Sequence, residues 1–227
     1  MFLPYGVALA VHQSLTFLDG SWKPYRYTKM DRGFIFARCC LPNGLTCVAT
    51  STHLESFNGK DDNGSPARQN QLLEMEEFCN KHIEEKTADL AIMMGDLNWD
   101  DARKNPDDPV LDDVLTSVEW KDAWLETNHL RSTVDAKKGF TYDPKLNPML
   151  AGSLRRRFDR CLIRKARHIQ TNLVSTALVG TEALPGLSHQ KTNPYNNSVR
   201  TVPTAPSDHF CVVTQIQTFS SGKTLKG

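Results

Sequence analysis

The order of apolar runs and amphipathic segments between residues 46 and 94 constrains the fold of this chain most. Residues 46–52 form an apolar-rich run typical of a strand, and a polar loop at 59–66 follows. A compact apolar run at 89–94 then ends at Gly95, as a buried central strand does. Between loop and run, apolar or small residues recur at roughly helical spacing: Ala67, Leu72, Leu73, Met75, Phe78 and Ile83. Strand, helix and strand in this order predict a layered α/β domain.

Turn signals and short apolar runs extend this pattern over one domain, residues 1–219. The turn Pro42-Asn43-Gly44 between two apolar-rich runs predicts a hairpin. Residues 185–206 are rich in Pro, Asn, Ser and Thr and predict a long surface loop, and the tail 220–227 is expected to be disordered. Further strands are expected at residues 6–12, 21–28, 33–41, 140–142, 158–164, 168–175 and 210–216.

Charge and cysteine usage exclude several classes of protein. Lys and Arg total 27 against 26 Asp and Glu, a net charge of +1, so a nucleic-acid partner must be recognised by local patches. The apolar opening lacks a basic segment and contains Pro4, which favours a core strand over a signal peptide. Six cysteines without a C-x-x-C pair are typical of buried thiols. We expect a soluble monomer in the nucleus or cytoplasm that does not bind membranes.

Polar clusters stand at the ends of apolar runs, where α/β sheets place active sites. In Gly95-Asp96-Leu97-Asn98, alternation sends Asp96 and Asn98 to the same side, where they can deprotonate and orient a water molecule. An Asx turn that caps the strand is the alternative. In Thr52-His53-Leu54-Glu55-Ser56, His53 and Ser56 offer donors to a phosphate, although a lone histidine there is more often a structural hydrogen-bonding group.

Two later clusters add an imidazole and an acid. In Ser207-Asp208-His209-Phe210, His209 can stabilise charge on phosphorus if an acid fixes its tautomer. Asp159, in Arg157-Phe158-Asp159-Arg160, is the candidate acid, and a surface ion pair is the alternative. The basic run around it predicts the one local patch suited to a polyanion, unless it is a solvated strand edge: Arg155, Arg156, Arg157, Arg160, Arg164, Lys165 and Arg167.

Signatures of other hydrolytic mechanisms are absent from the sequence. It contains no G-x-S-x-G nucleophile motif and no H-E-x-x-H zinc motif. Acid, amide and imidazole groups remain, and they suit water attack on a phosphodiester with a hard cation, Mg²⁺ or Mn²⁺.

The motifs T-H-L-E-S, G-D-L-N, R-F-D-R and S-D-H-F, in this order, resemble the later motifs of the endonuclease/exonuclease/phosphatase (DNase-I-like) family. With Tyr27-Thr28-Lys29-Met30 and Asn70-Gln71-Leu72, they are most similar to its tyrosyl-DNA phosphodiesterase subgroup. The resemblance implies a two-sheet α/β sandwich that hydrolyses phosphodiesters of nucleic acid, including 5′-tyrosyl adducts removed in DNA repair. It implies catalytic roles for Asp96, Asn98, Asp159 and His209, substrate-binding roles for His53, Ser56, Trp99 and Tyr142, and Asp208 beside the metal.

The resemblance also has departures. Relatives begin with a strand that carries an Asn and a later Gln-Glu pair whose Glu binds Mg²⁺, and nothing before Thr46 supplies either motif. We therefore expect the sandwich to lack its first strands, which would leave unpaired strand edges and an open core. The 227-residue chain should then aggregate, and a monodisperse product that melts cooperatively would contradict this prediction.

Two other functions stay open at this point. One is a phosphatase or phosphodiesterase of the same fold that acts on inositol phosphates or lipids. The other is a catalytically dead homologue that retains only a binding surface. The interleaved aromatic and basic residues favour nucleic acid, and DNA 5′ ends in particular, as the partner.

Overall fold

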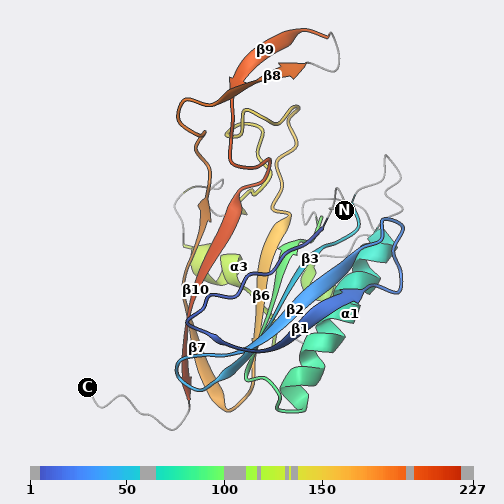
Figure 1. Cartoon of the computed structure of the whole chain (residues 1–227), viewed down its shortest axis with the longest axis vertical. Coiled ribbons are helices and arrows are strands. Elements are labelled where there is room, and N and C mark those ends of the chain that lie inside the picture. The colour runs from blue at the N-terminus through green and yellow to red at the C-terminus, as the bar shows by residue number, and fades with distance from the viewer. Residues whose placement is uncertain are drawn as a thin grey trace, which may run out of the picture.

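The computed structural model describes residues 6–56, 65–99, 111–116, 119–130, 133, 138–192 and 197–220. The helices are α1 (Ser65–Glu84), α2 (Leu111–Val114) and α3 (Ala123–Asn128). The strands are β1 (Thr16–Pro24), β2 (Gly33–Cys40), β3 (Thr46–His53), β4 (Leu90–Asp96), β5 (Lys121–Asp122), β6 (Asp159–Lys165), β7 (Ile169–Val179), β8 (Ser188–Thr192), β9 (Val199–Pro203) and β10 (Cys211–Ser220). They form a six-stranded sheet of order β1-β2-β3-β4-β6-β5, a pair β10-β7 and a pair β8-β9 (Figure 1).

The first half of the large sheet follows the predicted pattern closely. Strands β2 and β3 form the expected antiparallel hairpin, and Gly44 in its turn has φ 83°, a conformation that glycine adopts without strain. Strand β1 begins before the predicted residue 21 and pairs with β2. The expected strand at residues 6–12 is not formed: this segment pairs with no strand in the described part of the chain.

Helix α1 covers one face of the large sheet (Figure 1). Its apolar side buries Leu72, Met75 and Cys79 against Val48 of β3 and Met93 of β4. Each such side chain contributes about 1.5 to 3 kcal/mol when fully buried. Strands β3 and β4 are parallel and joined through α1, as the order strand, helix, strand predicts. This crossover brings the carboxyl ends of β3 and β4 side by side.

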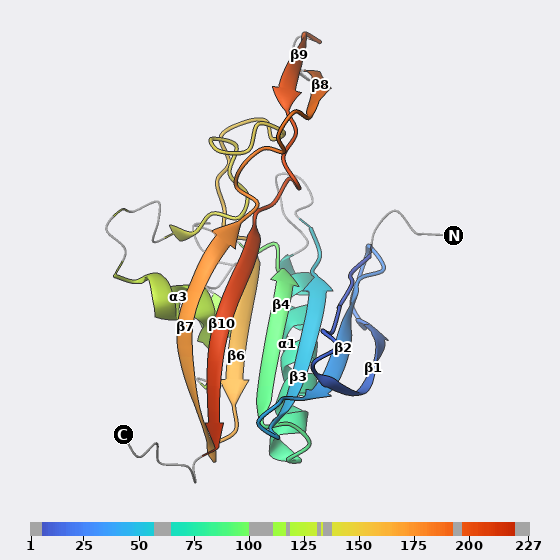
Figure 2. The same cartoon turned by 60° about the vertical axis from the view of Figure 1, so that its left-hand side comes forward.

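The opposite face of the sheet is covered only in part. Strands β7 and β10 stand beside β6 (Figure 2), and in the described part of the chain β10 pairs with β7 alone. Ile92, Cys161 and Ile216 are therefore only partly buried between the sheets. A cleft of about 570 Å³ separates β10 from the large sheet, and its apolar lining includes Met94, Val212 and Ile216.

Three arginines of the basic run at residues 155–167 are buried, so they do not contribute to the predicted polyanion-binding patch. Asp122 caps α3 and accepts hydrogen bonds from Arg157 at 2.6 Å and from Arg160 at 3.2 Å. Both arginines are less than 9% exposed. Arg164 is also buried and bonds to Glu119 at 2.8 Å. A buried guanidinium requires such an acidic partner, and removal of either partner would leave an uncompensated buried charge.

The segment 185–206 also differs from the prediction of an irregular loop. It contains the antiparallel hairpin of β8 and β9, which projects beyond one end of the sheets (Figure 1). Lys191, one pair from the turn end of this hairpin, donates to the carbonyl oxygens of Pro148, at 3.0 Å, and Leu150. Among the described residues, no helix combines the length and apolarity needed to cross a membrane.

Candidate active site

Three of the predicted site residues stand side by side across the end of the large sheet. Strand register places His53 of β3 opposite Asp96 of β4, and Asp96 opposite Asp159 of β6. His53 Nε2 lies 3.3 Å from Asp96 Oδ2. Strands β3 and β4 end at this edge of the sheet, and the antiparallel strand β6 begins there. Residues that are far apart in the sequence therefore present their polar groups together.

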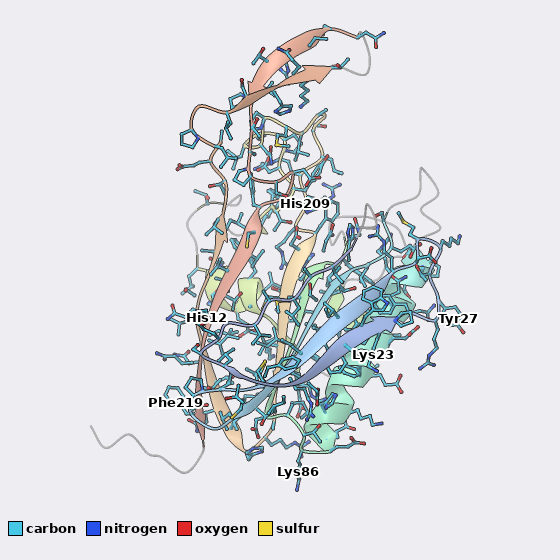
Figure 3. The ribbon with its side chains drawn as sticks, viewed as in Figure 1. His12, Lys23, Tyr27, Lys86, His209 and Phe219 are labelled. Carbon is cyan, nitrogen blue, oxygen red and sulfur yellow. The ribbon has the colours of Figure 1, made fainter. Side chains whose placement is uncertain are left out.

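His209 joins this row from the second sheet. It precedes β10, and its Nδ1 lies 2.7 Å from Asp159 Oδ2 and 3.9 Å from Asp96 Oδ2. Figure 3 shows it at the end of the sheets near the base of the β8-β9 hairpin, while Lys86 lies at the opposite end. The structure thus brings together the predicted acid and imidazole in the orientation that fixes the tautomer of His209.

The environment separates the pKa values of these groups. Burial, and then the negative charge of Asp159, raise the pKa of Asp96 to about 6. Burial, and then the positive charges of Arg32 and His209, lower the pKa of His53 to about 4. Burial alone would lower the pKa of His209, but the hydrogen bond and charge of Asp159 outweigh it and raise the pKa. At neutral pH, Asp96 is therefore ionised, His53 is neutral, and His209 is the histidine that favours a positive charge.

The backbone around Gly95 allows Asp96 and Asn98 to face the same side. Gly95 has φ 131°, and a Cβ atom there would lie 2.0 Å from the Thr52 carbonyl oxygen. Asn98 has φ 48°, and its backbone N–H donates to Asp96 Oδ1 at 2.8 Å. The Asx turn considered as the alternative is thus present, and it orients the carboxylate. The Asn98 amide donates to the Leu54 carbonyl at 3.1 Å and to Ser56 Oγ at 3.4 Å.

Two buried residues that the sequence did not single out hold the R-F-D-R and S-D-H-F segments together. Thr141 Oγ1 accepts from the backbone N–H of Asp159 at 3.1 Å, and the Thr141 carbonyl accepts from the N–H of Phe210 at 2.8 Å. Asn147 donates to the carbonyls of Ser207 and Asp208. A short polar residue on an irregular segment carries no local signal for such contacts, so only the structure identifies them.

Arg32 is a further residue that the sequence reasoning missed. It is 8% exposed, and its Nη2 donates to Ser56 Oγ at 3.3 Å. Its charge lowers the pKa of both His53 and Asp96. Ser56, Asn98 and Arg32 therefore form a group of donors beside the acidic row. The only sequence signal is its place after the Tyr27-Thr28-Lys29-Met30 segment.

The remaining predicted residues differ in position. Tyr142 is partly exposed, and its ring meets that of His209 edge to face, with centroids 5.4 Å apart. Asp208 is exposed and precedes His209. Trp99 is only 4% exposed and packs in the hydrophobic cluster under α1. Its ring therefore presents little surface to a substrate.

The oxygen donors at this end of the sheets are of the kind that bind Mg²⁺ or Mn²⁺. Carboxylate and amide oxygens are suitable ligands, and Asp96, Asn98, Asp159 and Asp208 supply them near one another in sequence motifs. However, no group of three or more acidic, histidine or cysteine side chains among the described residues is arranged to hold a metal ion. A bound ion would therefore need ligands beyond these side chains, and substrate phosphate oxygens are suited to that role.

Comparison with known proteins bears on this geometry. No family model and no curated protein matches the sequence. TDP2 (tyrosyl-DNA phosphodiesterase 2) of D. rerio, crystallised with a single-strand DNA product, is similar with a TM-score of 0.63 and 22% identity over 90% of this chain and 69% of that chain. Truncated TDP2 of Caenorhabditis elegans has a TM-score of 0.64 and 21% identity, over 92% of this chain and 68% of that chain. An endonuclease/exonuclease/phosphatase family protein of Bacteroides thetaiotaomicron has a TM-score of 0.53 and 14% identity, over 91% of this chain and 66% of that chain.

These similarities establish the fold. The chain has the mixed α/β architecture with more than one sheet that TDP2 and other endonuclease/exonuclease/phosphatase proteins share, as its sequence motifs predict. It spans about two thirds of the length of each of these structures.

Proposed function

We propose that the chain is a hydrolase that cleaves phosphodiesters of nucleic acid by attack of water on phosphorus. The observation that carries this proposal is the row of His53, Asp96 and Asp159, closed by His209 at the end of the sheets. The proposed phosphate-binding imidazole, His209, lies 2.7 Å from its orienting acid, Asp159, and 3.9 Å from the proposed base, Asp96. The shared fold of the nuclease and phosphodiesterase neighbours supports the same reaction class.

Asp96 is the proposed general base. Its pKa of about 6 places it near the operating pH, where a base is both ionised and able to take a proton. The Asn98 N–H fixes one carboxylate oxygen, which leaves the other oxygen beside His53 and His209. A water molecule bound there would lose its proton to Asp96 as it attacks phosphorus.

The donors around Asp96 would hold the phosphate. His209, whose positive form Asp159 stabilises, would donate to a non-bridging oxygen and offset the charge that develops in the transition state. Neutral His53, Ser56 and Arg32 would contact the 5′ phosphate on the other side.

The substrate proposed within this class is DNA with a 5′ adduct such as tyrosine. The edge-to-face contact with His209 sets Tyr142 at the rim of the site, where a nucleobase can stack on its ring. The single-strand DNA product bound by the D. rerio neighbour supports this choice. Dependence on Mg²⁺ or Mn²⁺ is also part of the proposal, with Asp208 as one ligand.

The pH dependence of kcat/KM should report the ionisation of Asp96. Activity is expected to rise with pH through about pH 6, because only the ionised carboxylate accepts a proton. In Asp159→Asn, loss of the neighbouring negative charge should move this rise to lower pH, although kcat itself falls. Initial rates measured across the acid range test this, with Asp89→Asn, at the other end of β4, as control. A midpoint that Asp159→Asn leaves in place would contradict the assignment.

A substrate panel tests the proposed class. With Mg²⁺ present, we expect the chain to release tyrosine from a 5′-tyrosyl oligonucleotide and to leave an inositol phosphate and sphingomyelin intact. Turnover of either of those compounds, without turnover of the oligonucleotide, would identify the chain as a phosphatase or phosphodiesterase that acts on inositol phosphates or lipids. Absence of turnover on all three would favour a homologue without catalytic activity.

A further inference from the structure

Glu55 is a buried acid for which the proposed mechanism has no use. It is 2% exposed, although it directly precedes Ser56 at the end of β3. Its Oε1 accepts from the backbone N–H of Lys29 at 2.9 Å, and its Oε2 accepts from Thr28 Oγ1 at 3.0 Å and from Gln71 Nε2 at 2.9 Å. Gln71 Oε1 in turn accepts from the Glu55 N–H at 2.9 Å. A buried carboxylate with this many directed bonds fixes the position of every group that donates to it.

These bonds belong to a closed ring that includes two of the phosphate-binding donors. Thr28 Oγ1, which donates to Glu55, also accepts from the backbone N–H of Arg32 at 2.8 Å. The guanidinium of Arg32 donates to Ser56 Oγ at 3.3 Å. Ser56 is covalently joined to Glu55. The ring therefore runs from Glu55 through Thr28 and Arg32 to Ser56 and back.

The ring is attached to rigid parts of the fold on two sides. Gln71 lies in the buried face of α1 and also donates to the carbonyl of Tyr27 at 2.8 Å, which fixes the turn between β1 and β2. Asn98 donates to Ser56 Oγ and so connects the ring to the strand that carries Asp96. The turn, the end of β3 and the helix are thus held in one arrangement.

We infer that Glu55 is a positioning residue that sets the distance between Arg32 and Ser56 and thereby shapes the phosphate-binding side of the site. This inference rests on the proposed function for its ligand, a 5′-phosphorylated oligonucleotide. Glu55 does not touch Asp96 or His209 in the described contacts, so its loss should weaken substrate binding more than it slows the chemical step.

The substitution Glu55→Gln tests the role of Glu55. The amide nitrogen of glutamine cannot accept the hydrogen bonds that Thr28, Lys29 or Gln71 donates to the carboxylate. The ring should therefore open, and Arg32 and Ser56 should move apart. We expect KM for the 5′-tyrosyl oligonucleotide to rise roughly 10-fold or more while kcat changes little, since displaced supporting groups typically cost roughly 10- to 100-fold. Affinity for a 5′-phosphorylated oligonucleotide, measured by fluorescence anisotropy, should fall by a similar factor. Because the charge of Arg32 lowers the pKa of Asp96, displacement of Arg32 should also move the acidic limb assigned to Asp96 to higher pH.

A matched control and a second variant separate positioning from loss of structure. Glu74, on α1 like Gln71, accepts from the N–H of Arg26 in the turn between β1 and β2. Because it is outside the ring, Glu74→Gln should leave KM unchanged. Thr28→Val should raise KM and Thr28→Ser should restore it, because only the hydroxyl belongs to the ring. A wild-type KM and affinity in both Glu55→Gln and Thr28→Val would overturn the inference.

The outcomes for the inference and for the proposed function can be told apart. If the wild-type chain binds the phosphorylated oligonucleotide without hydrolysing the adduct, the catalytic proposal fails and the binding comparison still decides the role of Glu55. If the wild-type chain neither binds nor hydrolyses, both proposals fail. If it does both and the variants match it, the inference alone fails.

Discussion

Replacing Asp96 with asparagine is expected to lower kcat on a phosphodiester substrate about 100- to 10,000-fold, the usual contribution of a positioned general base. The amide keeps the size of the side chain and the acceptor for the Asn98 N–H, but it does not take a proton from water. The fold should be retained. The pKa of Asp96 is raised from 3.8 to about 6 in the folded chain, so this group lowers stability as the pH rises from 3.8 through about 6, and the asparagine variant avoids that loss.

A control at the other end of the same strand makes this result specific. Asp89 precedes β4, accepts from the Thr46 N–H at 2.8 Å and lies away from His209. Asp89→Asn should keep wild-type kcat. Melting curves of both variants would show that the fold is intact. Undiminished turnover in Asp96→Asn would remove Asp96 from the mechanism.

The substitution Gly95→Ala is expected to destabilise the chain by roughly 2 to 6 kcal/mol. A residue with a side chain at φ 131° carries strain of about 1 to 3 kcal/mol, and insertion of a methyl group into a filled space costs about 1 to 3 kcal/mol more. The added Cβ would lie 2.0 Å from the Thr52 carbonyl oxygen, so β3 and β4 must separate at the row of His53 and Asp96. Equilibrium unfolding in urea measures the loss.

Gly44→Ala provides the matched comparison. Gly44 has a similarly positive φ of 83°, but nothing lies within 4 Å of the position of its missing Cβ. This variant should therefore show the backbone strain alone, about 1 to 2 kcal/mol. Equal losses of stability in the two variants would mean that the strand ends adapt to a side chain at Gly95 and that their close approach is not required.

The parts of the fold that follow from local pattern were predictable from the sequence. The alternation of β2 and β3, the turn at Asn43-Gly44 and the apolar side of α1 all depend on neighbouring residues. Asp96 and His209 were also identified, because each stands beside an apolar strand of obvious pattern. Asp159 lies beside Asp96 because β6 pairs with β4, and it is hydrogen-bonded to His209. The sequence indicated this association only through the resemblance of its motifs to those of the family.

The incorrect predictions concern residues whose environment is not determined by the neighbouring sequence. Arg157 and Arg160 were assigned to the surface because their buried partner, Asp122, lies 35 and 38 residues earlier. Strands β8 and β9 were missed because their residues are mostly polar and pair with each other away from the sheets. Trp99 follows a site motif in sequence, yet its ring turns into the core. Local pattern contains no information on these three choices.

The most direct test of the proposed mechanism is hydrolysis of a 5′-tyrosyl oligonucleotide in oxygen-18 water, with Mg²⁺ and with the products analysed by mass spectrometry. Attack of an Asp96-activated water on phosphorus predicts heavy oxygen in the 5′ phosphate of the DNA and none in the released tyrosine, and product from Asp96→Asn at a rate about 100- to 10,000-fold lower. Heavy oxygen in the tyrosine hydroxyl, or an intact substrate with the wild-type chain, would contradict it.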